Sequence, residues 1–355
     1  MVTKQLKILL FADTHLGFDF PQRPRIKIRR RGFDFFNNFY KILDYAAKRC
    51  PDFLIHGGDL FFRSRVAPVI VDKVYKALFD FVNKTGIPIY IVPGNHERSY
   101  LPQSLYLAHP LINVFNRPRC FNFKKDGIRG SLHGFPFYRG AIRAQFKHLL
   151  RECGWNQDGS HFQLLVLHQA IDGAQVGPVN YTFRNTNDVI DIREIPPSAA
   201  AVLSGHIHRR QVLYSNKVPI IYPGSIERTS FAEKEEQKGL YEIDFSSGSE
   251  GGSDDGPDDR KAWIVEKIKF LRLPVRPMAD IYLNGLHSKS EIKRSIVEQC
   301  AALSQDCIIR LRIPEADPDV YSLVNLPFIR SILPSTFSLQ LGMIFHNKPA
   351  HKGRY

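Results

Sequence analysis

The chain has 355 residues, 43% of them hydrophobic and 24% charged, which is room for one large domain and one small one. Its 49 Lys and Arg against 35 Asp and Glu give a formal net charge of +14, which favours nucleic acid first and acidic membranes second as partners. Five irregularly spaced cysteines without a CxxC pair argue against a disulfide framework, and no apolar run is long enough for a signal peptide or a membrane span. We therefore expect an intracellular protein, cytoplasmic and nucleoid-associated if its source is prokaryotic.

The first half alternates short apolar runs with amphipathic stretches. Residues 8–12 and 53–55 read as buried strands, with a helix over 33–48 between them. A second helix is expected from Pro68 to Gly86, followed by a strand over 87–92. Two β-α-β units in series predict a parallel sheet.

The later sequence predicts further strands and a change of character. Apolar runs end directly before His168 and shortly before His206. The stretch 246–259 is rich in Ser, Gly and Asp and predicts an acidic flexible loop; an acidic mimic of DNA is the alternative interpretation. We predict a first domain over 1–270 and a small α+β domain over 271–355.

Candidate metal ligands follow the predicted strands, at the sheet edge where sites of α/β proteins are built. All are oxygen or nitrogen donors, which suit Mn, Fe or Zn ions: Asp13, His15, Asp59, Asn95, His168, His206 and His208. Two such ions held close together can activate water and bind the oxygens of a phosphate ester.

His96 is the candidate catalytic residue, as a general acid or a stabiliser of the transition state. It follows Asn95 and precedes Glu97, and a neighbouring carboxylate can fix the tautomer of an imidazole. The alternative is that His96 only shapes its loop.

The ordered motifs DxH, GD, GNHE, H and GHxH, over about residues 7–245, resemble the calcineurin-like metallophosphoesterase superfamily. The longer segments 13–17, 58–61 and 223–228 are similar to SbcD-type DNA repair nucleases. The resemblance implies an α/β fold: a calcineurin-like β-sandwich flanked by helices, followed by a small α+β capping domain that helps to admit DNA.

The resemblance also implies how the site works. One ion would bind Asp13, His15, Asp59 and His208, and the other would bind Asp59, Asn95, His168 and His206. Manganese is the usual activating ion of the family, a coiled-coil ATPase of SbcC type is its usual partner, and a homodimer is common. Phe62 departs from the pattern, because many relatives have His or Asp at this position.

A basic segment lies between the first ligand pair and the first helix, and we expect it to contact DNA phosphates. It contains Arg23, Arg25, Lys27, Arg29, Arg30 and Arg31 and no acidic residue. The alternative is a solvated charged loop.

Together these features predict a two-metal-dependent DNA phosphodiesterase, an exonuclease or endonuclease in double-strand break or DNA end processing. One alternative is a metallophosphoesterase for small molecules or phosphoproteins, which would use the same ligands but would have little need of the positive charge. A second is a non-catalytic scaffold with the same fold.

Overall fold

The computed structural model describes residues 5–20, 30–102, 109–157, 159–247, 263–286, 288–314 and 324–344. The chain divides into two compact units. Unit 1 comprises Met1–Phe18 and Asp34–Pro274, and unit 2 comprises Asp19–Phe33 and Val275–Tyr355. The predicted boundary after residue 270 falls inside a strand of unit 1, and the predicted acidic loop lies outside the described residues from residue 248 onward.

The first sheet of unit 1 contains the predicted β-α-β units. Its order is β16-β15-β1-β2-β3-β4. Strands β1 to β4 are parallel to one another, β15 is antiparallel to β1, and β16 is antiparallel to β15. The strands are β1 (Gln5–Phe11), β2 (Phe53–His56), β3 (Ile89–Ile91), β4 (Ile112–Val114), β15 (Gly239–Ser247) and β16 (Trp263–Arg272).

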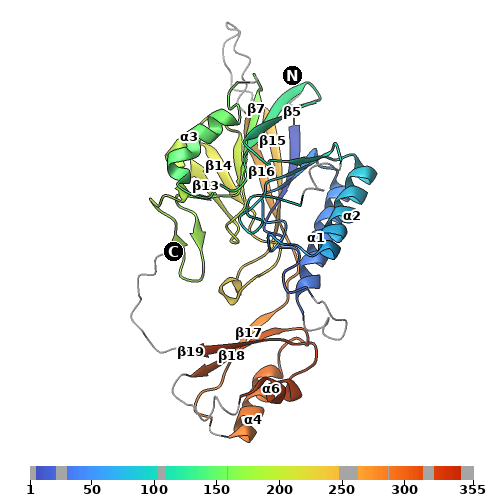
Figure 1. Ribbon diagram of the computed structural model, residues 1–355, viewed down its shortest axis with the longest axis vertical. Helices are drawn as coiled ribbons and strands as arrows, with labels where there is room; N and C mark the ends of the chain where they lie inside the picture. The colour runs from blue at the N-terminus through green and yellow to red at the C-terminus, as the bar shows by residue number, and fades with distance from the viewer. Residues whose placement is uncertain are drawn as a thin grey trace. The chain divides into compact units, whose positions relative to one another are not determined.

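Two helices connect the parallel strands of this sheet and lie along one of its faces (Figure 1). They are α1 (Gly32–Arg49) and α2 (Pro68–Thr85). Pro68 begins α2, where its missing N–H costs no hydrogen bond. Gly86 ends the helix in a left-handed conformation with φ of 70°, which glycine adopts without strain.

The second sheet of unit 1 has the order β13-β14-β12-β7-β6-β5. Its strands are β13 (Gln211–Ser215), β14 (Val218–Tyr222), β12 (Ala201–Ser204), β7 (Phe162–Leu167), β6 (Ile128–Gly134) and β5 (Arg119–Lys125). Helix α3 (Ile142–Glu152) packs on its outer face through an apolar cluster that includes Leu165 and Leu167. Two short strand pairs lie beside it: β8 (Ala170–Ile171) with β11 (Val189–Ile190), and β9 (Gln175–Val176) with β10 (Tyr181–Thr182).

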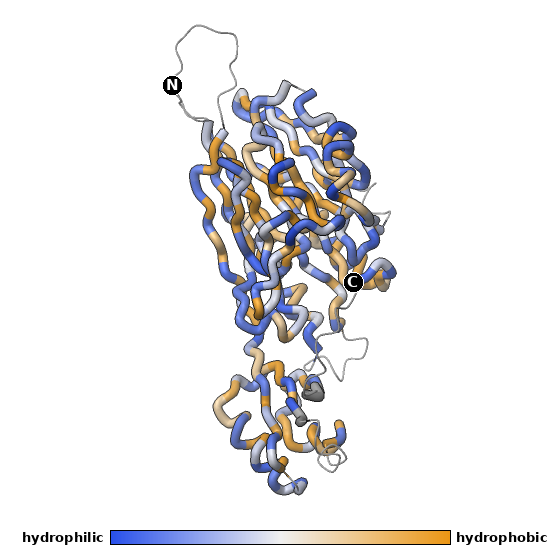
Figure 2. Tube along the Cα trace, turned by 90° about the vertical axis from the view of Figure 1, so that its left-hand side faces the viewer, coloured by the Kyte–Doolittle hydropathy of each residue, from blue (hydrophilic) through white to orange (hydrophobic). Residues whose placement is uncertain are grey.

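The two sheets pack face to face around the main core of unit 1. Alternate residues of β1 (Leu6, Ile8 and Leu10) share one buried cluster with Leu164 and Val166 of β7. This alternation is what a strand with one face toward a core requires. Figure 2 shows hydrophobic residues alternating with hydrophilic ones along much of the chain. The predicted α/β fold, a β-sandwich flanked by helices, is therefore confirmed.

Unit 2 has its own sheet and its own core. Strands β17 (Met278–Tyr282), β18 (Ile308–Pro314) and β19 (Ser338–Ile344) are parallel. Among its described residues after 275, the helices are α4 (Lys289–Cys300), which begins with a capping box formed by Ser288 and Glu291, and α6 (Leu326–Ile332). Ile281, Ile292 and Ile329 belong to one buried cluster. Within the described ranges of both units, no helix is long and apolar enough to cross a membrane.

Replacing Phe162 tests the core between the sheets. Its ring is fully buried and meets the rings of Phe245 and Trp263 edge-on. We expect Phe162→Ala to lower the free energy of unfolding by about 3–5 kcal/mol, measured by urea denaturation, because it removes packing and leaves a cavity. Tyr214→Ala, at an exposed position of β13, should change it by less than about 0.5 kcal/mol. Equal effects of the two substitutions would contradict this placement of the core.

Candidate metal centre

The seven predicted ligands follow strands of both sheets. In the first sheet, Asp13 and His15 follow β1, Asp59 follows β2 and Asn95 follows β3. In the second sheet, His168 follows β7, and His206 and His208 follow β12. Since both sheets present these strand ends at one edge of the sandwich, candidate ligands as distant in sequence as Asp13 and His208 come together there.

One cluster of donors consists of Asp13, His15 and His208, whose ligand atoms all lie within 4.8 Å of one another. The Nε2 atoms of His15 and His208 are 2.9 Å apart, and His208 Nε2 is 3.9 Å from Asp13 Oδ1.

A second cluster is built around His168. Its Nε2 lies 3.0 Å from Asn95 Oδ1 and 3.4 Å from Asp59 Oδ2. The same Asn95 oxygen is 2.9 Å from His206 Nδ1. The predicted ligands therefore lie in two adjacent groups.

Asp59 belongs to both groups. Its Oδ2 is 3.4 Å from His168 Nε2 in one cluster and 4.0 Å from His15 Nε2 in the other. The side chain is almost fully buried, so this carboxylate faces imidazoles on two sides and little water. A carboxylate in this position can bridge two cations.

The donor set fits divalent cations. Two ligands bound at about 2.1 Å to one ion lie about 3 Å apart at a right angle and about 4.2 Å apart when opposite, and the measured separations fall in or near this range. Asp13 Oδ2 and His15 Nδ1 are buried and have no hydrogen-bond partner in the described ranges. Buried polar atoms without partners are rare unless a ligand or water satisfies them.

Burial and mutual charge set the protonation of these groups. Burial lowers the pKa of His15, and it lowers that of His206 to about 3, so both imidazoles are neutral and able to bind a metal. Burial alone would raise the pKa of Asp59, but the neighbouring His168 and His15 bring it below its usual range. Asp59 is therefore ionised at neutral pH, as a bridging ligand must be.

The backbone at the site is held in an unusual conformation. Asp13, His15, Asp59 and His206 have φ of 51°, 43°, 54° and 80°, in the left-handed region that residues other than glycine rarely adopt. Such strain persists where the surrounding structure enforces it, and it concentrates at functional sites. Only glycine fits at position 58, since its φ is 108° and a Cβ there would collide with the His168 ring.

Hydrogen bonds outside the clusters fix the imidazole tautomers. His168 Nδ1 donates to the carbonyl of Gly57 at 2.7 Å, which leaves Nε2 for the cluster. His208 Nδ1 donates to Glu233 Oε1 at 3.1 Å, and the buried ammonium of Lys238 lies 2.6 Å from the other oxygen of Glu233. A carboxylate behind a ligand histidine orients the ring and raises its basicity. No sequence motif points to Glu233, because it lies 25 residues after His208 in no recognisable spacing.

His96 lies at the edge of the site with its side chain 35% exposed. Its Nδ1 is 2.9 Å from the carbonyl oxygen of Phe62, which can only accept, so Nδ1 carries a proton. Its Nε2 is 3.9 Å from Asp59 Oδ2 and faces the clusters. The expectation that Glu97 fixes this tautomer is wrong. The Glu97 carboxylate instead accepts hydrogen bonds from the backbone N–H groups of Phe61 and Gly94, at 2.6 and 2.7 Å.

The basic segment predicted to contact DNA is described only at its end. Arg30 forms an ion pair with Asp19 at 2.7 Å, and Arg31 is buried. Burial takes the Arg31 side chain away from the surface that a DNA contact needs. The other members lie outside the described residues: Arg23, Arg25, Lys27 and Arg29.

A comparison with protein families matches residues 6–210 to the calcineurin-like phosphoesterases. The chain belongs to the calcineurin-like phosphoesterase family. The matched segment contains all seven candidate ligands and His96, and this family binds divalent metals.

Three relatives among those found are similar to this chain over about two thirds or more of its length. A DNA double-strand break repair protein Mre11 from Archaeoglobus fulgidus is 26% identical over 64% of this chain and 52% of its own length. An Mre11 from Saccharolobus solfataricus is 29% identical over 81% and 68%. An uncharacterized metallophosphoesterase, YhaO of Bacillus subtilis, is 26% identical over 67% and 57%. The chain thus spans about half to two thirds of the length of these relatives.

The role of Glu233 can be tested by metal binding alone. We expect Glu233→Gln to weaken Mn²⁺ binding by about tenfold or more in isothermal titration, because the amide cannot supply the charge that supports His208. Glu235→Gln is the matched control, since that side chain is 88% exposed. If both variants bind Mn²⁺ as the wild type does, Glu233 does not support the metal centre.

Proposed function

We propose that this chain is a two-metal-dependent DNA phosphodiesterase of SbcD or Mre11 type, acting in the processing of DNA ends. The observation that carries the proposal is the Asp59 carboxylate shared between two donor clusters. In this proposal one ion binds Asp13, His15, Asp59 and His208. The other binds Asp59, Asn95, His168 and His206, and manganese is the activating ion.

Bound metal ions would supply an activated water and charge stabilisation for the phosphate. The side chains of the protein have separate tasks. Asp59 and Asn95 hold their oxygens within the two donor clusters, and the buried imidazoles of His15 and His206 are neutral. His96 keeps one proton at Nδ1 through the Phe62 carbonyl and presents Nε2 at the solvent-exposed edge. A proton held at Nε2 is placed to reach a leaving alkoxide.

DNA is proposed as the substrate for two reasons. The net charge of +14 favours a polyanion, and relatives over much of the chain are named as DNA double-strand break repair proteins. A small-molecule phosphoesterase would share the ligands but not need the charge. A scaffold without catalysis would not need the buried, unpartnered Asp13 Oδ2.

The resemblance extends the proposal to partners and domains. A coiled-coil ATPase of SbcC type and a second copy of this chain are the proposed protein partners, and the cell interior is the proposed location. The three-stranded module of unit 2 is proposed to act as a capping domain for DNA.

Two substitutions test the roles of the site residues. Asp59→Ala should lose metal binding and nuclease activity together, because both clusters lose a ligand. His96→Ser should keep the metal content while kcat falls by a factor of about 10² or more, because only the proton donor is removed. The measurements are metal analysis of the purified protein and Mn²⁺-dependent degradation of labelled single- and double-stranded DNA.

Each rival predicts a different result. Hydrolysis of a small phosphate diester without salt-sensitive DNA affinity would favour a small-molecule enzyme. A metal-free protein inert toward both substrates would favour a scaffold. Cleavage by His96→Ser at the wild-type rate would remove His96 from the mechanism.

A further inference from the structure

A second pocket adjoins the metal centre and shares His96 with it. The pocket has a volume of about 670 Å³ and is formed by the segments that follow Asp59 and Asn95. It is lined by Phe62, Arg63, Ser64, Arg65, His96 and Arg98. Three of its six residues are arginines and none is acidic.

The charge of this pocket is not balanced from within the protein. Arg63, Arg65 and Arg98 are exposed, and over the described ranges no guanidinium of the three forms an ion pair or a hydrogen bond. Arg63 lies over the ring of Phe62, 5.5 Å from its centre, which is a cation–π contact and leaves the charge uncompensated.

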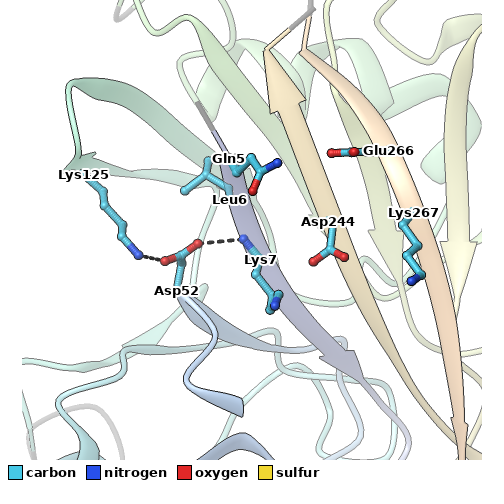
Figure 3. A pocket seen from close by; sticks show the side chains of 8 residues that line it. All are labelled: Gln5, Leu6, Lys7, Asp52, Lys125, Asp244, Glu266 and Lys267. Atoms are coloured by element: carbon cyan, nitrogen blue, oxygen red, sulfur yellow. Dashed lines mark hydrogen bonds and ion pairs between the residues drawn. The ribbon is translucent and has the colours of Figure 1, made fainter. Parts of the chain in front are cut away.

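Another pocket of unit 1 provides a contrast (Figure 3). It is lined by Lys7, Lys125 and Lys267 but also by Asp52, Asp244 and Glu266, and Lys125 forms an ion pair with Asp52. It opens at the start of β1, about 20 Å of strand from the end that leads to Asp13. Charge in that pocket is balanced, whereas the pocket beside the metal centre carries only positive charge.

The backbone holds Arg98 next to the metal ligands. Arg98 and Ser99 have φ of 55° and 66°, in the strained left-handed region. Arg98 N donates to Asn95 O at 3.1 Å, and Ser99 N donates to Gly94 O at 2.9 Å. Arg98 therefore sits on the same tight turn as Asn95 and His96, and its position is coupled to theirs.

We infer that Arg63, Arg65 and Arg98 form a subsite for a backbone phosphate next to the phosphodiester that is cut. This rests on the proposed function, because it assumes that the cut phosphate lies at the metal centre. One guanidinium group can bind two phosphate oxygens at once through two parallel N–H donors. His96 forms a wall common to both sites, so neighbouring phosphates of one strand can occupy them together.

The subsite selects a class of substrate. A phosphoserine or a small phosphate ester carries one phosphate group and cannot fill the metal centre and the arginine pocket at once. A polynucleotide has further phosphates beside any internal one. The arginines thus favour a DNA strand over the single-phosphate substrates of the rival functions.

Binding tests the subsite without cleavage. The triple variant R63Q/R65Q/R98Q should bind a fluorescently labelled single-stranded oligonucleotide roughly tenfold more weakly than the wild type, measured by anisotropy with EDTA present. The slope of log affinity against log salt should also flatten by about 0.7 for each phosphate that the variant no longer binds. Lys124→Ala removes an exposed charge at the residue before Lys125 of the charge-balanced pocket and should leave both quantities unchanged.

Cleavage assays locate the backbone phosphate that the arginine subsite binds. Two oligonucleotides are compared, one with a neutral methylphosphonate on the 5′ side of the cut and one with it on the 3′ side. With the wild type, one of the two substitutions should lower kcat/KM by about five- to tenfold and the other should not. The triple variant should show no such loss, which is the signature of a coupled pair. Its oligonucleotide kcat/KM should fall more than its kcat/KM for bis(p-nitrophenyl) phosphate.

The outcomes separate the subsite from the proposed function. If the wild-type protein cuts neither DNA nor the small diester, the proposed nuclease activity is refuted. The anisotropy comparison still tests whether the arginine pocket binds phosphate. If the triple variant has the same affinity and the same salt slope as the wild type, the subsite is refuted. Single Arg→Gln variants, each with a smaller loss, replace the triple variant if its thermal melt shows misfolding.

Discussion

The candidate metal centre is organised around one buried carboxylate that faces imidazoles from both sheets. Asp59 Oδ2 lies between His15 and His168, with hardly any solvent exposure. Removing a charge from water is costly unless neighbouring groups offset the loss. Here His168 lowers the pKa of Asp59, and Asp59 in turn brings the pKa of His168 to about 9 although burial would lower it. A bound cation would stabilise the same arrangement further, so folding and metal binding favour one geometry.

This geometry exists only when both sheets are packed. The first sheet supplies Asp59 and the second supplies His168, and they are joined at the shared edge by backbone hydrogen bonds. Gly205 N donates to Gly57 O at 3.1 Å across the sheets, and a Cβ on Gly205 would lie too close to that carbonyl. Core packing far from the ligands therefore also positions them.

The sequence predicted most of the site because each ligand follows a strand, and strand ends in a parallel sheet meet at one edge. All seven candidate ligands come together. The helices and parallel strands of the first sheet were predictable from apolar periodicity, whereas the sandwich was implied by the resemblance to the phosphoesterase superfamily. Periodicity carries no information about partners distant in sequence. It missed Glu233 behind His208, and it assigned Glu97 to His96 because the two are adjacent in the chain. Adjacent side chains in a tight turn point in different directions, and Glu97 binds backbone N–H groups instead.

Phe62 contacts His96 through both its main chain and its ring. The resemblance to the family implies His or Asp at this position in many relatives, and Phe62 departs from that pattern. The contact to His96 is made by the main-chain carbonyl of Phe62, at 2.9 Å, so the tautomer of His96 does not depend on side chain 62. The Phe62 ring packs against Phe18 and His96 and forms an apolar wall of the arginine pocket. An apolar wall cannot neutralise Arg63 by an ion pair, as an aspartate at this position would. The departure from the family pattern therefore leaves the positive charge available to a phosphate.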